Sequence, residues 1–306
     1  MRKIYNFKKY LILIIAVFAV SSSAIFVKLA QAPSIIIAFY RLFFTTLIFL
    51  PFLILNKKYI KELKELSKKN WIASILSGII LSIHYYLWFE SLNYTSIGSS
   101  TVIVTLQPLF AVLGGFIFFK ENFNRKSIIG CFIAVLGSII VGFNDFQAGG
   151  IALYGDLLAF IAAGIITVYF FISQSIRKDL SLIPYSVISY LSSSIFLGII
   201  SYQSKKAFLG YSLNTWLALL GLSIFATILG QSIFNWLLKW LSTSIISMSI
   251  LGEPIGTLFL AFIIFNETIT SRQGIGILLI LCGLSSFLLG KSNFKIKKTY
   301  TRINSE

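Results

Sequence analysis

About ten apolar stretches, each of about 20 residues, follow one another along this chain of 306 residues. A helix of that length crosses a hydrocarbon layer of about 30 Å. Backbone amides in lipid must be hydrogen-bonded within their own segment, so the stretches are predicted to be helices. Only 12% of the residues are charged, about half the share typical of soluble chains. The sequence therefore predicts an all-α integral membrane protein.

The apolar stretches fall into two sets of five. The predicted spans are 10–30, 35–55, 71–92, 97–119 and 126–143, then 154–174, 183–203, 214–236, 242–265 and 271–290. This divides the chain into an N-terminal segment (1–9), two five-helix units (10–143 and 154–290) and a basic tail (291–306). The first apolar run continues to Ala30, past the small residues that would end a signal peptide. We therefore expect a retained first span.

Lysine and arginine are distributed unevenly between the two sides of this predicted topology. With the N-terminus inside, 21 of the 26 basic residues lie in inside segments, and three (Lys205, Lys206 and Arg272) lie in outside loops. Short cytoplasmic loops of membrane proteins carry such an excess, so both termini are predicted to be cytoplasmic. The same distribution explains the net charge of +16 without a nucleic-acid partner.

An internal repeat relates the two sets of spans. A shift of 146 residues aligns identical residues in both halves: Ser96 with Ser242, Pro108 with Pro254, Glu121 with Glu267, Gly130 with Gly276 and Gly137 with Gly283. Because each unit has five spans, an odd number, the two units must insert with opposite orientation. Inverted repeats can exchange conformations and open one site alternately to each side, which favours transport over a passive scaffold.

Several segments carry a family resemblance. They are Val20–Ala30, Phe39–Leu42, Trp88–Ser96, Leu106–Pro108 and Phe119–Glu121, with Glu253–Pro254 and Asn266–Glu267 in the second half. In combination they resemble the EamA-type bacterial members of the drug/metabolite transporter superfamily, over residues 10–290. The chain departs from its own repeat at one place, because Gln107 stands in the first half where Glu253 stands in the second.

The resemblance implies a carrier of ten transmembrane helices, built as two inverted five-helix EamA repeats around a central cavity. It implies a multi-pass protein of the bacterial cytoplasmic (inner) membrane that moves amino acids, other metabolites or drug-like compounds. It implies no ATPase domain and no cofactor. The substrate, the direction of movement, a coupling proton or cation and a homodimer all stay open.

Polar groups inside the spans are candidate site residues, because they are costly in lipid. His84 lies near the middle of its span with Trp88 one turn later, where it could bind substrate or accept a proton. The alternative is a histidine held by one interhelical hydrogen bond. Glu253 precedes a helix-breaking proline and is a candidate for a substrate amine or a coupling ion, or else a protonated glutamic acid bonded to a neighbouring helix. Gln107 is its matched counterpart.

Two further predictions concern pairs of residues. Gln231 and Asn235 are spaced by one helical turn and are expected to line the cavity, although such pairs more often join helices. Arg41 and Glu90 lie at similar depth below the outer surface and are expected to form an ion pair, either a fixed one or a gate.

The leading hypothesis is a secondary transporter working by alternating access, not an enzyme. A membrane-embedded transferase would need acids and bases clustered at one membrane face, and a non-transporting assembly protein would not need the repeat. A single histidine and two cysteines inside spans provide no metal site.

Overall fold

The computed structural model describes residues 2–142, 150–265 and 270–303. Side chains are described there except at 2–7, 97, 98, 142, 261, 265 and 291–303. This part of the chain is helical with no strand. Within it, nine helical segments are long and apolar enough to cross a membrane. The predicted all-α membrane class is therefore confirmed.

The helices follow the predicted spans closely. The first half contains α1 (Arg2–Ser21), α2 (Ser23–Leu29), α3 (Ser34–Leu55), α4 (Lys57–Lys64), α5 (Lys68–Ser91), α6 (Ile97–Val104), α7 (Gln107–Phe119) and α8 (Arg125–Gly142). The second half contains α9 (Ile151–Ile176), α10 (Leu182–Gln203), α11 (Leu213–Gly221), the π-helix η2 (Leu222–Gln231), α12 (Ser232–Leu237), α13 (Thr243–Ile250), α14 (Glu253–Phe265) and α15 (Ser271–Ile303). The predicted end of the fifth span, residue 143, lies outside the described residues.

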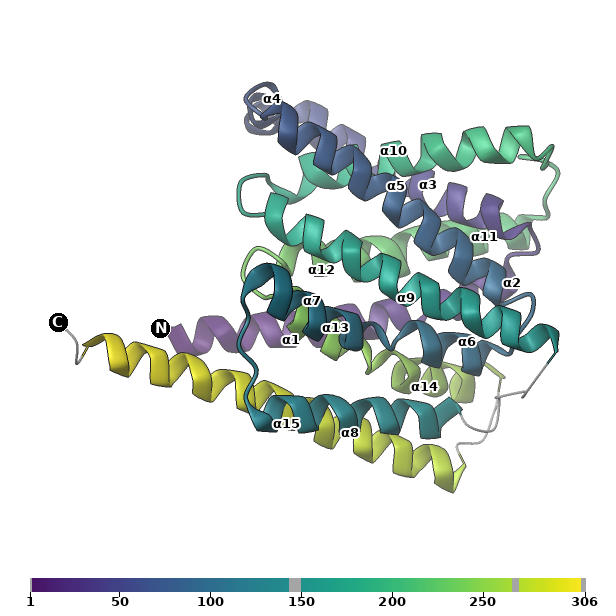
Figure 1. Ribbon diagram of the computed structural model, residues 1–306. Coiled ribbons are helices and arrows are strands. Elements are labelled where there is room, and N and C mark those ends of the chain that lie inside the picture. Colours follow the sequence, from purple (N-terminus) through teal and green to yellow (C-terminus); the bar gives the residue numbers. More distant parts are fainter. Residues whose placement is uncertain (1, 143–149, 266–269, 304–306) are drawn as a thin grey trace.

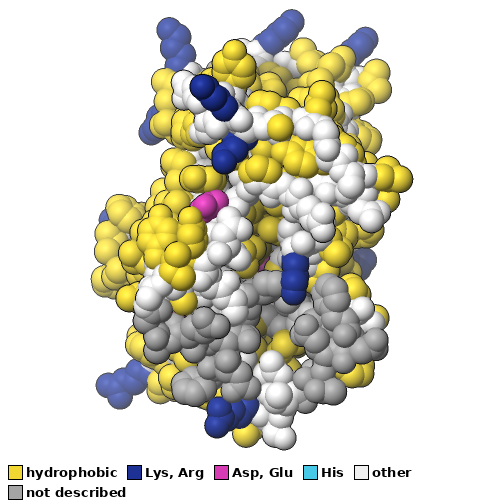
Figure 2. All heavy atoms as spheres, turned by 90° about the vertical axis from the view of Figure 1, so that its right-hand side faces the viewer, with side chains coloured by type: hydrophobic (Ala, Val, Ile, Leu, Met, Phe, Trp, Pro, Cys, Tyr) yellow, Lys and Arg dark blue, Asp and Glu magenta, His cyan; other side chains and the backbone are white. Residues whose placement is uncertain are grey.

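The long helices run roughly alongside one another in a bundle (Figure 1). The start of α1, the end of α15 and the short helix α4 lie at one end of the bundle, which we call the α4 end. The opposite end carries α2 and the first turn of α9. Figure 2 looks onto this opposite end, where hydrophobic side chains cover the flanks and a hollow lies near the middle.

Two of the predicted spans are broken into half-helices at matched positions of the repeat. The span predicted over 97–119 is split into α6 and α7, and the span predicted over 242–265 is split into α13 and α14. All four half-helices keep the 146-residue offset, so the two breaks occupy matched positions. Each second half-helix has proline at its second position, where the missing amide costs no helical hydrogen bond. Gln107 and Glu253 therefore begin matching half-helices.

Helices α8 and α15 pack side by side at one edge of the bundle (Figure 1). Glycines allow their close approach, because a Cβ placed on Gly137 would lie 2.7 Å from the carbonyl oxygen of Gly276. The converse distance, from a Cβ on Gly276 to the carbonyl oxygen of Gly137, is also 2.7 Å. The 146-residue offset maps this pair onto Gly283 and Gly130, and a Cβ on Gly130 would lie 2.6 Å from the carbonyl oxygen of Gly283, so the contact is repeated with the two halves exchanged.

Candidate functional site

A small cavity lies at the centre of the bundle and is lined by both halves of the chain. Its volume is about 30 Å³, enough for about one water molecule. The first half contributes Val20, Arg41, His84, Tyr85, Trp88, Val104 and Gln107, and the second half contributes Ile166, Phe170, Gln231, Phe234, Ile250 and Glu253.

The cavity lies on the axis that relates the two halves. Five lining residues of the first half match five of the second at the 146-residue offset: Val20 with Ile166, Tyr85 with Gln231, Trp88 with Phe234, Val104 with Ile250 and Gln107 with Glu253. Arg41 and His84 have no such match, because Val187 and Gly230 occupy the corresponding positions. The cavity is therefore symmetric in its backbone and asymmetric in its charge, with the cation from one half and the carboxylate from the other.

Buried polar atoms without hydrogen-bond partners converge on this cavity. Six of its lining residues each carry one such atom: Arg41 Nη2, Tyr85 OH, Trp88 Nε1, Gln107 Oε1, Gln231 Nε2 and Glu253 Oε1. An unsatisfied buried polar group costs about 1–3 kcal/mol, and a charged one costs more. Native structures contain few such groups, so their concentration around one cavity calls for a ligand.

Arg41 is fully buried on α3 and is not paired with Glu90, so the predicted ion pair is wrong. Its Nε donates to Thr227 Oγ1 at 2.8 Å and its Nη1 donates to Ser23 Oγ at 2.9 Å. The guanidinium carbon lies 4.0 Å from the centre of the Tyr85 ring. Two hydroxyls and one ring thus fix the guanidinium, and its Nη2 is buried without a hydrogen-bond partner.

Glu90 lies elsewhere, near the end of α5. Its carboxylate accepts hydrogen bonds from Asn93 Nδ2 at 3.2 Å and from the Tyr94 hydroxyl at 3.4 Å. Similar depth along two helices says nothing about which way each side chain points around its helix axis, and Arg41 points inward while Glu90 faces the loop that follows α5. The fixed ion pair is therefore absent from this structure, a gate formed by the two residues stays a prediction, and Arg41 lines the cavity.

His84 is held in one orientation by α9. Its Nδ1 lies 2.9 Å from the carbonyl oxygen of Ala162. Since a carbonyl only accepts, Nδ1 carries the proton, and Nε2 is the nitrogen left to bind a ligand or a second proton. The Trp88 ring stacks on the imidazole with 6.0 Å between centroids. The interhelical hydrogen bond of the alternative prediction is therefore present, and a role of Nε2 in substrate or proton binding stays a prediction.

Gln107 and Glu253 enter the cavity from the first residues of α7 and α14. Gln231 comes from the last residue of η2. A π-helical turn is rare and occurs mostly at functional sites; here it also provides Thr227, the acceptor for Arg41.

Asn235, which was predicted to line the cavity, does not. It lies on α12, about one turn nearer the α4 end than Gln231, and its Nδ2 donates to the hydroxyls of Tyr169 at 2.6 Å and Tyr190 at 3.2 Å. Tyr190 OH in turn lies 2.9 Å from Ser232 Oγ. These four side chains are almost completely buried. We call Tyr169, Tyr190, Ser232 and Asn235 the tyrosine layer.

Below the tyrosine layer, Arg177 joins α9 to α12. Its Nε donates to the carbonyl oxygen of Asn235 at 3.0 Å, and its Nη1 donates to the carbonyl oxygen of Leu180. Burial lowers the pKa of the guanidinium to about 10. This value is still above neutral pH, so the group stays protonated there. Sequence analysis missed Arg177, because its position just beyond a predicted span is typical of an inside-loop arginine.

Tyr85 is the cavity residue that sequence analysis missed although a signal existed. The 146-residue offset aligns Tyr85 with Gln231, which was already a candidate. A tyrosine in a span is more often a packing residue, and the repeat is the only feature that separates this one from the others.

The arrangement can bind a small molecule that carries both charges. Arg41, Trp88 and Gln231 offer hydrogen-bond donors, and Gln107 and Glu253 offer acceptors. Among the described residues, no group of three or more histidine, cysteine, aspartate or glutamate side chains is placed to hold a metal ion.

Comparison with known proteins identifies the family to which this architecture belongs. Residues 7–143 and 153–289 each match the EamA-like transporter family. An "Uncharacterized transporter" of Archaeoglobus fulgidus is 25% identical over 90% of this chain and 97% of its own length. The "Probable amino-acid metabolite efflux pump" of Salmonella typhimurium is 27% identical over 66% of this chain and 70% of its own length. A crystal structure titled "Crystal structure of protein" shares the fold, with a TM-score of 0.78 and 16% identity over 92% of this chain and 98% of that one. The chain, with two copies of the family's unit in succession, belongs to the EamA-like transporter family.

Proposed function

We propose that the protein is a secondary carrier that moves small zwitterionic metabolites, amino acids or close relatives, by alternating access and without a chemical step. The observation that carries this proposal is the set of six unpartnered polar atoms that converge from both halves on one central cavity.

A zwitterion would satisfy these atoms. Its carboxylate would accept hydrogen bonds from Arg41 Nη2, Trp88 Nε1 and Gln231 Nε2, and its ammonium group would donate to Glu253 and Gln107. Charge-assisted hydrogen bonds of this kind are about twice as strong as neutral ones. The name of the Salmonella relative, an amino-acid metabolite efflux pump, supports the same substrate class.

Alternating access follows from the symmetry of the cavity and its closure. A volume of about 30 Å³ is too small for an amino acid, so the halves must separate to admit one. The tyrosine layer closes the path to the α4 end, while the opposite end is hollowed near its middle (Figure 2). In this proposal the two halves rock about the cavity and open each side in turn.

The charge distribution supports an orientation with the α4 end in the cytoplasm of a bacterium, both termini included. His84 and Glu253 are the two cavity residues that could take up a proton, so the proposal assigns any proton coupling to them. The tyrosine layer then acts as the cytoplasmic gate.

Counterflow in proteoliposomes tests this function. Vesicles loaded with an unlabelled amino acid should accumulate the same labelled amino acid, and analogues lacking either the carboxylate or the ammonium group should compete at least tenfold less well. Empty vesicles and vesicles with the Glu253→Gln variant serve as controls. If no zwitterion in a broad panel exchanges above the empty-vesicle level, the proposed substrate class is wrong.

A further inference from the structure

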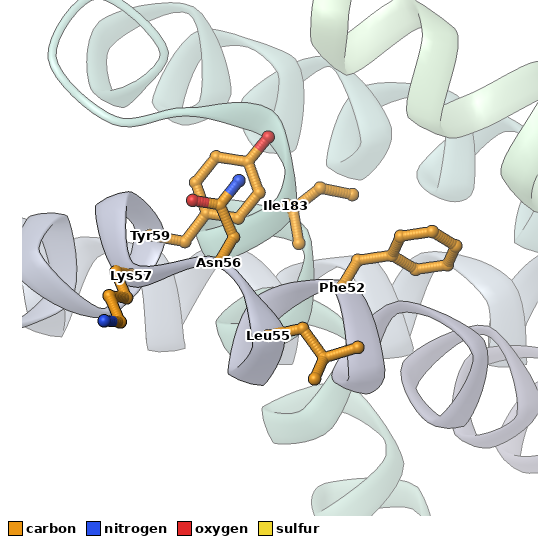
Figure 3. A pocket seen from close by; sticks show the side chains of 6 residues that line it. All are labelled: Phe52, Leu55, Asn56, Lys57, Tyr59 and Ile183. Carbon is orange, nitrogen blue, oxygen red and sulfur yellow. The ribbon is translucent and has the colours of Figure 1, made fainter.

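A second cavity lies far from the central one, where α3 ends and both α4 and α10 begin. Its volume is about 380 Å³. It is lined by Phe52, Leu55, Asn56, Lys57, Tyr59 and Ile183 (Figure 3). None of these residues lines the central cavity, so substrate binding does not account for it. Because it lies where two spans emerge from the bilayer, it sits at the depth of the lipid headgroups.

One side of this cavity offers hydrogen-bond donors. Asn56 Oδ1 accepts the backbone N–H of Lys58 at 3.0 Å, which leaves the amide nitrogen of Asn56 as a donor. The Tyr59 ring lies beside that amide, and Lys57 extends from the far side of the same turn (Figure 3). Within the described part of the chain, Lys57 forms no ion pair.

The nearby carboxylates already have hydrogen-bond or ion-pair partners. Glu62 accepts hydrogen bonds from the backbone N–H and the hydroxyl of Ser181 at 2.9 and 2.8 Å, and it pairs with Lys58 at 4.0 Å. Glu65 pairs with Lys61 at 3.7 Å. No acidic residue lines the cavity, so its polar side attracts an anion.

The other side of the cavity is apolar and open to lipid. Phe52 is 61% exposed and Leu55 is 82% exposed. Ile183 is half-buried on the first turn of α10 and lies opposite the polar side chains (Figure 3). An anion-binding side joined to an apolar side, at headgroup depth, matches a molecule with an anionic head and a hydrocarbon tail.

We propose that this cavity binds an anionic phospholipid of the adjacent leaflet. The phosphate lies against Asn56 and Tyr59, the Lys57 ammonium group adds a positive charge from the other side of the turn, and the first part of an acyl chain lies along Phe52 and Leu55. A volume of about 380 Å³ matches a headgroup and the start of a chain, not a whole lipid. Basic residues next to a span attract anionic lipids, and the lysines that continue along this segment add to that attraction. The proposal does not depend on the transport function.

Native mass spectrometry of the full chain in detergent tests the site. We expect phosphatidylglycerol to bind with a dissociation constant at least fivefold below that of phosphatidylcholine with the same acyl chains. The double variant Lys57→Gln, Tyr59→Phe should remove this preference, because one lysine at the surface is worth about fivefold. Lys69→Gln is the matched control, since it removes an equal charge from the same basic segment outside the cavity. If the double variant does not fold, Lys57→Gln alone should lose most of the preference.

Three results would overturn the proposal. The first is equal affinity for the two lipids. The second is an equal loss in Lys69→Gln and in Lys57→Gln, which would indicate a diffuse basic surface. The third is displacement of the lipid by inorganic phosphate at concentrations comparable to those of the lipid, which would indicate a site for soluble anions.

Discussion

Replacing Glu253 with glutamine changes one atom of the central cavity and removes its negative charge. The side chain keeps its size, and the backbone carbonyl of Glu253 still accepts the hydrogen bond from Ser21 Oγ at 3.1 Å. The start of α14 should therefore stay in place. The change converts a hydrogen-bonded ion pair with the substrate ammonium into a hydrogen bond from the ammonium to a neutral amide oxygen.

The magnitude follows from the loss of one charge of a buried, hydrogen-bonded charge pair, which costs about 2–5 kcal/mol. A loss of about 2 kcal/mol corresponds to about 30-fold weaker binding. A substrate analogue that lacks the ammonium group should bind the variant and the wild type about equally.

The assay is counterflow at a range of substrate concentrations, with the amount of reconstituted protein matched. The matched comparison is Gln107→Asn, which also weakens a contact to the ammonium group but leaves the charge of the cavity unchanged, so its loss should be the smaller of the two. An unchanged half-saturation concentration in Glu253→Gln would refute the placement of the ammonium group. An equal loss for the analogue without the ammonium group would indicate a structural effect.

Three other predictions concern the cation, the helix contact and the gate. Arg41→Lys keeps the charge but not the fork geometry of the guanidinium, so transport should fall at least tenfold. Discrimination against an analogue without the carboxylate should fall in the same measurement. Retained discrimination would remove Arg41 from the site. Gly276→Ala should lower the melting temperature in detergent, because overpacking against α8 costs about 1–3 kcal/mol. Gly274→Ala should not lower it, since nothing lies within 4 Å of its added Cβ. Equal melting temperatures of the two variants would contradict the packing. Asn235→Ala should speed the labelling of Ile166→Cys from the α4 end, because it removes two hydrogen bonds of the tyrosine layer; unchanged labelling would show that this layer is not a gate.

Much of the fold could be predicted from the sequence. Span length, loop charge and the 146-residue offset act on the whole chain, and errors at single residues do not affect them. The helix breaks were partly predictable, because proline at position 254 removes a backbone donor wherever it lies in a helix. That both halves would break at matched residues required the offset as well.

The site was predictable only in part. The structure brings His84, Trp88, Gln107, Gln231 and Glu253 to one cavity. The sequence gives the depth of a residue along its helix. Whether two residues touch also depends on how each helix is rotated about its axis and on which helices are neighbours in the bundle. That is why the predicted partner of Arg41 was wrong and its true partner, Thr227 on a π-helix of the other half, could not be found.

The account rests on one claim, that the cavity on the axis between the halves is the site exposed to each side in turn. Single cysteines at the matched positions Val104 and Ile250, in a chain whose Cys131 and Cys282 are replaced by serine, test it most directly. We predict that a membrane-impermeant thiol reagent labels both positions from either side of the membrane, and that the transported substrate slows labelling from both sides. Labelling of both positions from the same single side only, with or without substrate, would contradict the account.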